Sequence, residues 1–211
     1  MPSMPSNPLR LQTPRLELVA ATVEMLQADL AGRKELAEAL GAEVPDAWPP
    51  VNWERGPIEY LMGWMQKRPD AQGWFAWYCL LLPSPFGRGA GGEGVNEPRK
   101  PINPPIQNTL IGGLGFLGPP NAAGETEMGY SLLPDFQCQG HCPEALSALV
   151  DWAFSQSELD MLIIRTAPHH HPSIRVAEKL GFQFVGPGPD PDTIEYALDR
   201  AGWIQLRPNI A

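Results

Sequence analysis

The chain has 211 residues and carries 24 acidic and 15 basic side chains, which give it a formal charge of −9. This acidic balance argues against a nucleic-acid-binding surface and favours a cationic partner. Hydrophobic residues make up 43% of the chain, enough for a sizeable core, so a disordered chain is excluded. A single domain over residues 1–211 is predicted.

Three cysteines, an odd number, indicate free thiols in a reducing compartment rather than a disulfide framework. The N-terminus has neither a basic start nor a long apolar run, and no stretch reaches the roughly 18 apolar residues of a membrane span. These features predict a cytoplasmic protein that does not associate with membranes.

Two helices are predicted in the first third of the chain. Thr22 can cap the first helix, which ends near Gly41. Its leucines recur at roughly helical spacing and are Leu26, Leu30, Leu36 and Leu40. The second helix has one apolar stripe at i, i+3, i+4 and i+7, made of Ile58, Leu61, Met62 and Met65.

A long segment rich in glycine and proline interrupts the chain between Pro83 and Asn108. It shows no period of 2 or 3.6 and has few branched apolar residues, so it cannot pack as a regular element. Runs typical of strands lie on both sides, at 74–82 and 110–117. We expect residues 83–108 to be a loop inserted into a hairpin.

The second half of the chain predicts alternating strands and helices. Residues 126–133 alternate in part and predict a strand with two different faces. Pro143 suits the first position of a helix whose apolar residues recur at helical spacing as far as Phe154. The remaining predicted elements are a buried strand, a helix and two further strands, at 160–167, 172–180, 182–185 and 193–198.

A short loop with a glycine, residues 134–142, joins the two-faced strand to this helix. The amide N–H groups of a first helical turn and the positive end of the helix dipole can hold a phosphate without a basic side chain. An ordinary strand-to-helix turn explains the same residues. The loop alone therefore does not decide between the two interpretations.

Four motifs in this order resemble the GNAT superfamily of acyl-CoA-dependent N-acetyltransferases. They are the strand from Glu127 to Leu133, the loop from Gln137 to Cys142, the helix from Glu144 to Phe154, and the segment from Ser173 to Phe182. Thr13-Pro-Arg-Leu16 is similar to the start of members of the ribosomal-protein, Rim-type branch. The resemblance covers residues 11–82 and 110–200. It implies an α/β fold with a central mixed, strongly bent sheet flanked by helices and splayed between its fourth and fifth strands.

The resemblance also implies acetyl-CoA as cosubstrate and no metal. Leu132 and Leu133 would pair with the pantetheine amides. The loop that would hold the pyrophosphate consists of Gln137, Cys138, Gln139, Gly140, His141 and Cys142. It departs from the family pattern at Cys142, which replaces a small final residue, and at Pro143, which removes one amide donor.

Amine acetylation needs a base for the acceptor nitrogen and stabilisation of the departing thiolate. By resemblance the transfer is direct, Glu127 is the base, acting directly or through water, and Ser173 hydrogen-bonds CoA near the sulfur. The alternatives are a solvated strand carboxylate for Glu127 and a helix cap for Ser173. Glu195 and Tyr196 are reserve candidates for base and acid.

Two further positions depart from the superfamily in the segment around Ser173. His170 stands where the family has an asparagine, and it can still donate one hydrogen bond. Ala177 stands where many members place a tyrosine acid, although Rim-type members commonly have an aliphatic residue there.

The expected acceptor is a cationic amine, either a small molecule or a protein N-terminus. Its pocket would be built from the two early helices, where Trp48 and Trp53 either line it or pack, and where Trp64 is expected to pack. A homodimer stays open as an oligomeric state.

Other classes of function also stay open. Cys138, His141, Cys142 and the histidines at 169–171 offer ligands for a metal such as zinc, although their spacing matches no paired cysteine motif. Cys138 or Cys142 could instead be a nucleophile whose thiol pKa is lowered by the helix N-terminus. A non-catalytic acyl-CoA-binding module would bind CoA without turnover.

Overall fold

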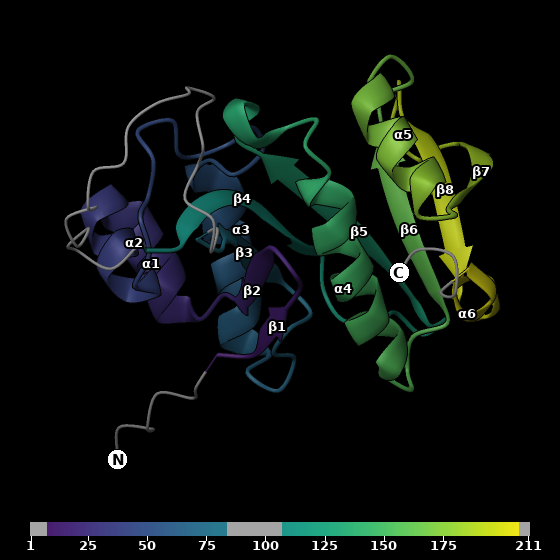
Figure 1. Cartoon of the computed structure of the whole chain (residues 1–211). Helices are drawn as coiled ribbons and strands as arrows, with labels where there is room; N and C mark the ends of the chain where they lie inside the picture. The colour runs from purple at the N-terminus through teal and green to yellow at the C-terminus, as the bar shows by residue number, and fades with distance from the viewer. Residues whose placement is uncertain (1–7, 84–106, 207–211) are drawn as a thin grey trace, which may run out of the picture.

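The computed structural model describes residues 8–83 and 107–206. The predicted insertion 83–108 lies outside the described residues, apart from its ends. The described chain forms an eight-stranded sheet with strand order β1-β2-β3-β4-β5-β6-β8-β7 (Figure 1). The strands are β1 (Arg10–Gln12), β2 (Leu16–Ala20), β3 (Ala76–Leu81), β4 (Thr109–Phe116), β5 (Glu125–Leu132), β6 (Met161–Thr166), β7 (Gln183–Pro187) and β8 (Ile194–Asp199).

The sheet opens between β5 and β6. These two strands are parallel and pair only over Glu125–Glu127 of β5, whereas all other neighbouring strands are antiparallel. Beyond that point β5 pairs with β4 alone as far as Leu132, and β6 pairs with β8 alone as far as Thr166. The predicted mixed, splayed sheet is confirmed. The opening follows the fifth strand in chain order rather than the fourth, and strands β1 and β2 had not been predicted from the sequence.

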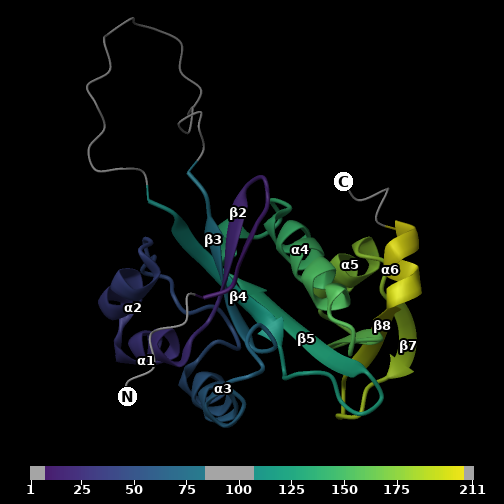
Figure 2. The same cartoon turned by 90° about the horizontal axis from the view of Figure 1, so that it is seen from below.

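Helices cover both faces of the sheet (Figure 2). One face carries α1 (Val23–Ala31), α2 (Arg33–Leu40) and α3 (Arg55–Lys67), and the other carries α4 (His141–Ser155), α5 (His171–Lys179) and α6 (Arg200–Leu206). A 3₁₀ turn, η1 (Pro134–Phe136), precedes α4. Within residues 8–83 and 107–206, no helix is long and apolar enough to cross a membrane.

Strand β3 shows why the run 74–82 is apolar throughout. Trp77 and Cys79 face the core under α4, whereas Tyr78 and Leu80 face the core under α1–α3. Successive side chains of a strand point to opposite faces, so a strand buried on both faces needs apolar residues at every position.

The single helix predicted between Thr22 and Gly41 is two helices, α1 and α2. Thr22 caps the first as predicted, and its hydroxyl accepts a hydrogen bond from the Met25 amide at 3.2 Å. The break falls at Gly32, which has φ +154°. A glycine tolerates this backbone conformation, and the leucine spacing carries no sign of it.

Trp48 and Trp53 are packed and also line a pocket beside Asp29, whereas Trp64 lies at the surface. The indole N–H groups of Trp48 and Trp53 donate to the Asp29 carboxylate at 2.8 and 3.0 Å, and both residues are buried. Trp53 lies so close to β4 that a Cβ on Gly113 would stand 2.2 Å from its ring. Trp64 is 44% exposed on α3, so the prediction that it packs was wrong.

Candidate active site

The candidate site lies where β5 and β6 stop pairing. Beyond that point side-chain contacts, rather than backbone hydrogen bonds, link the two halves of the sheet. Side chains of β5 alternate, so Met128 and Tyr130 point to the α4 face and Glu127 points to the other. Each face has one side-chain link across the opening. We name the ion pairs of Glu127, Arg165 and Glu195 the charged bridge, and the contact between Tyr130 and Ser173 the neutral bridge.

The charged bridge holds one guanidinium between two carboxylates. Arg165 on β6 donates to Glu127 through Nη1, and to Glu195 on β8 through Nε at 2.9 Å. Burial raises the pKa of Glu127, and Asp190 and Glu195 add to that rise, while Arg165 opposes it. The result is a half-buried carboxylate that takes up a proton more readily than an ordinary glutamate.

The neutral bridge joins β5 to α5. The Tyr130 hydroxyl lies 2.9 Å from Ser173 Oγ and 3.2 Å from the Ser173 carbonyl oxygen. Ser173 does not cap α5, because the N-cap position belongs to His170, so the cap interpretation was wrong. The exposed His170 imidazole reaches Thr166 Oγ1 at 3.3 Å and makes no capping bond.

At the end of β5, the structure offers only one of the two predicted pantetheine partners. The Leu133 amide donates to Ile111 of β4 at 2.8 Å, and its carbonyl accepts from Phe136 at 2.9 Å, so both groups are already engaged. Because backbone groups of a strand alternate in direction, those of Leu132 and Tyr130 face the opening. The Leu132 carbonyl accepts a hydrogen bond from Gln137 Nε2 at 2.8 Å, which leaves its second lone pair available to pantetheine.

The loop after η1 turns sharply into α4. Cys138 and Gly140 have positive φ angles of 57° and 80°, and Gly140 is the N-cap. Gln139 turns its side-chain amide back to the Asp135 carbonyl at 2.7 Å. This bond and that of the Gln137 amide to the Pro134 carbonyl at 3.2 Å brace the loop.

Helix α4 begins earlier than predicted. Its first residue is His141, so Pro143 is the third helical residue rather than the first. The His141 imidazole is buried and its Nδ1 lies 3.2 Å from the Phe136 carbonyl oxygen, so the ring packs within the protein. The first turn thus offers the amides of His141 and Cys142 to an anion, and Pro143 offers none.

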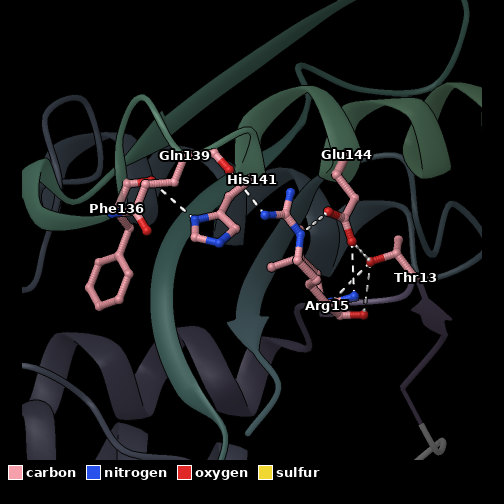
Figure 3. Close-up of polar contacts among 7 residues, drawn as sticks. Thr13, Arg15, Phe136, Gln139, His141 and Glu144 are labelled. Atoms are coloured by element: carbon pink, nitrogen blue, oxygen red, sulfur yellow. Dashed lines mark hydrogen bonds and ion pairs between the residues drawn. The ribbon is translucent and has the colours of Figure 1, made fainter. Parts of the chain in front are cut away.

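Arg15 is a residue of this site that the sequence interpretation missed (Figure 3). Its Nη1 donates to the Gln139 carbonyl at 3.0 Å, and its Nε donates to Glu144 at 2.6 Å. Glu144 also accepts from the Thr13 hydroxyl at 2.6 Å. Burial acts to raise the pKa of Glu144, but the hydrogen bonds from Thr13 and Arg15 outweigh it and lower that pKa. The only sequence signal was the segment Thr13-Pro-Arg-Leu16.

Cys142 is not a nucleophile activated by the helix N-terminus. Burial raises the pKa of the Cys142 thiol to about 12, so the lowering expected from the helix N-terminus does not occur. Cys138 is exposed. No group of three or more histidine, cysteine or acidic residues that could hold a metal occurs among the described residues, so the histidines at 169–171 do not join the cysteines.

The reserve candidates lie on opposite faces of β8. Glu195 belongs to the charged bridge, whereas Tyr196 is buried and its ring packs against Phe184 at 5.6 Å between centroids. The structure therefore brings Glu127 and Glu195 together and places Tyr196 in the core.

Comparisons with known proteins agree with this geometry. Residues 51–183 match the family model described as an acetyltransferase (GNAT) domain. YjdG of Bacillus subtilis strain 168, an uncharacterized N-acetyltransferase, is 26% identical over 172 residues, which are 82% of this chain and 88% of that protein.

Solved structures share the fold. The acetyltransferase from Agrobacterium tumefaciens strain C58 has a TM-score of 0.58 at 20% identity and covers 95% of this chain and 99% of its own. RimL, the ribosomal L7/L12 alpha-N-protein acetyltransferase in complex with coenzyme A, has a TM-score of 0.57 at 17% identity, with 90% and 98% covered. Because the family model matches more than half of the chain, this protein belongs to the GNAT family of acetyl-CoA-dependent N-acetyltransferases.

Proposed function

We propose that the protein transfers the acetyl group of acetyl-CoA directly to a cationic primary amine. The observation that carries this proposal is the placement of the Glu127 carboxylate at the point where β5 and β6 stop pairing. The opening beyond that point presents strand backbone groups on one side and ends at the first turn of α4. A thioester laid along it would bring its carbonyl close to a carboxylate with a raised pKa.

The strand backbone, the first turn of α4, the loop before it and α5 would together hold the cosubstrate. The backbone of Leu132 and Tyr130 would pair with pantetheine, and the amides of His141 and Cys142 would receive the pyrophosphate. The other predicted loop residues would help to bind the pyrophosphate through their backbone conformation. They are Gln137, Cys138, Gln139 and Gly140. His170 and Ser173 would lie on the α5 side of the opening. The side chains of Gln137 and Gln139 are already bonded within the loop.

A cationic primary amine loses two protons in this reaction. The first passes to solvent before the attack and frees the nitrogen lone pair, and the second leaves during the attack. As the nitrogen attacks the thioester carbon, this second proton passes to Glu127, directly or through one water molecule. The carbon–sulfur bond breaks, and its electron pair moves to sulfur. Arg165 holds Glu127 in place and, by opposing the rise of its pKa, keeps the carboxylate ionised and able to accept the proton.

The charges at the mouth of the opening favour a cationic acceptor. Glu127, Glu195 and Asp190 lie there with one compensating cation, Arg165, so the local charge is negative. Both a polyamine-like small molecule and a protein N-terminus meet this requirement. The name of RimL, an alpha-N-protein acetyltransferase, supports the second acceptor as one to test.

Two measurements test the proposal. Calorimetric titration should give one-to-one binding of acetyl-CoA and of CoA, because both carry the pyrophosphate. Release of free CoA thiol should then depend on an added amine, screened over peptides with free N-termini, polyamines and aminoglycosides. Binding without release with any amine would show a non-catalytic acyl-CoA-binding module and overturn the proposal.

A further inference from the structure

The neutral bridge lies on the α4 side of the opening, where the acyl donor's sulfur would pass α5. Ser173 is 8% exposed, and its hydroxyl lies 2.9 Å from the Tyr130 hydroxyl. Ala177 stands one helical turn later on α5, fully buried, and carries no proton donor. On the face of α5 that meets Tyr130, Ser173 therefore supplies the hydroxyl.

Tyr130 and Ser173 have two ways to share their protons. In the first, the Ser173 hydroxyl donates to the Tyr130 oxygen while the Tyr130 hydroxyl donates to the Ser173 carbonyl oxygen at 3.2 Å. In the second, the Tyr130 hydroxyl donates to Ser173 Oγ at 2.9 Å, and the Ser173 proton is free to point elsewhere. A negative charge in the opening favours the second arrangement.

Burial raises the pKa of Tyr130, against a smaller lowering from its bond to Ser173. The phenol thus stays protonated over the whole working pH range and always has a hydrogen to donate. It is a poor proton source for the same reason, so it acts through its hydrogen bond.

We propose that Tyr130 is a positioning residue that turns the Ser173 hydroxyl toward the sulfur of the departing CoA. This proposal rests on the proposed function. As the carbon–sulfur bond breaks and its electron pair moves to sulfur, Ser173 donates a hydrogen bond to the thiolate, and Tyr130 donates one to Ser173. No proton crosses this bridge, since the amine proton has gone to Glu127.

The test compares two acyl donors, acetyl-CoA and its selenium analogue, acetyl-seleno-CoA. A selenolate is the better leaving group and accepts hydrogen bonds more weakly, so help from Ser173 matters less. With acetyl-CoA, Tyr130→Phe should lower kcat about tenfold, the upper value of one hydrogen bond between neutral groups, and change KM less than twofold. With the selenium donor the loss should shrink to less than about threefold.

Ser173→Ala is the second variant, and the double variant completes a cycle. Because Tyr130 acts through Ser173, Tyr130→Phe should cost nothing further once Ser173 is alanine. The matched control is Tyr78→Phe, which removes another buried phenol hydroxyl, bonded to Asp29 at 3.0 Å and remote from the opening. It should leave kcat with both donors unchanged.

The outcomes separate the two proposals. If the wild type is active, three results would overturn the role of Tyr130 and leave the proposed function intact. Tyr130→Phe could keep full kcat, lose kcat equally with both donors, or lower kcat further in the Ser173→Ala background. A wild type that binds acetyl-CoA and turns over no amine overturns the proposed function, and the role of Tyr130 with it.

Discussion

The charged bridge and the neutral bridge both link the two sides of the opening, but through different chemical groups. The charged bridge is half-buried, and its carboxylates are shared by one guanidinium. The neutral bridge is more deeply placed and joins two hydroxyl groups. In a half-buried ion pair the cost of burying the charges offsets much of their attraction, whereas a hydrogen bond between buried groups leaves an unsatisfied partner when it is lost. We therefore expect the charged bridge to matter more for turnover and the neutral bridge more for stability.

The largest effect expected is on turnover in Glu127→Gln. An amide cannot accept the amine proton, so kcat/KM should fall about 10²- to 10³-fold, within the usual range for a general base. The measurement is the rate of CoA release over a series of amine concentrations, which gives kcat/KM. Glu17→Gln, which breaks the ion pair with Arg10 at 2.9 Å on β2, is the matched control and should keep full activity. Full activity of Glu127→Gln would move the base to Glu195.

The pH dependence of turnover sharpens the role of Arg165. Only ionised Glu127 accepts a proton, so activity should rise with pH through its pKa, which burial raises above that of an ordinary glutamate. In Arg165→Gln the opposing charge is gone, and this acidic limb should move to higher pH. Arg10→Gln should leave the pH profile of kcat/KM in place. A limb that moves to lower pH in Arg165→Gln would contradict the assignment.

The stability ranking of the bridges should be the reverse of their ranking in turnover. Tyr130→Phe should lower the free energy of unfolding by about 1 kcal/mol, the usual value of a lost intramolecular hydrogen bond. Glu127→Gln should lower it by less than about 0.5 kcal/mol. Urea denaturation followed by tryptophan fluorescence measures both differences, read from midpoints at equal slopes. A larger loss of unfolding free energy in Glu127→Gln than in Tyr130→Phe would contradict this ranking.

The smallest effect is expected from replacing residues 84–106 with a short glycine-serine linker. Leu81 and Thr109 are paired across β3 and β4, so the two ends already lie side by side. Loop length changes the closure entropy only slowly, by about 0.6 kcal/mol for each doubling. Melting temperature, acetyl-CoA affinity and both bridges should stay nearly unchanged. A large drop in melting temperature would show that the segment is more than an insertion.

Elements with a long periodic signal could be predicted from the sequence. Helix α4 and strands β3 to β6 bury one or two faces over six or more residues, so their hydrophobic pattern identifies them. Strand β1 has three residues, too few for a period, and α6 is also short. The break at Gly32 depends on a backbone angle, which a leucine pattern does not encode.

The site was harder to predict, because its contacts join residues far apart in the chain. Arg15 and Glu144 are 129 residues apart, and Tyr130 and Ser173 are 43 apart. The motif indicated which segments meet, and the structure brings those segments together. The directions of individual groups, such as the inward imidazole of His141 and the engaged amide of Leu133, depend on packing partners from other elements.

The unequal exposure of the three cysteines gives the protein a natural attachment point for a spectroscopic probe. Cys79 is buried and Cys142 is shielded, and burial raises the pKa of both thiols, so neither presents a thiolate to a reagent. Cys138 is exposed in the loop that precedes α4. A maleimide fluorophore should therefore attach at Cys138 alone, next to the proposed pyrophosphate site, and report cosubstrate arrival through its emission without any engineered cysteine.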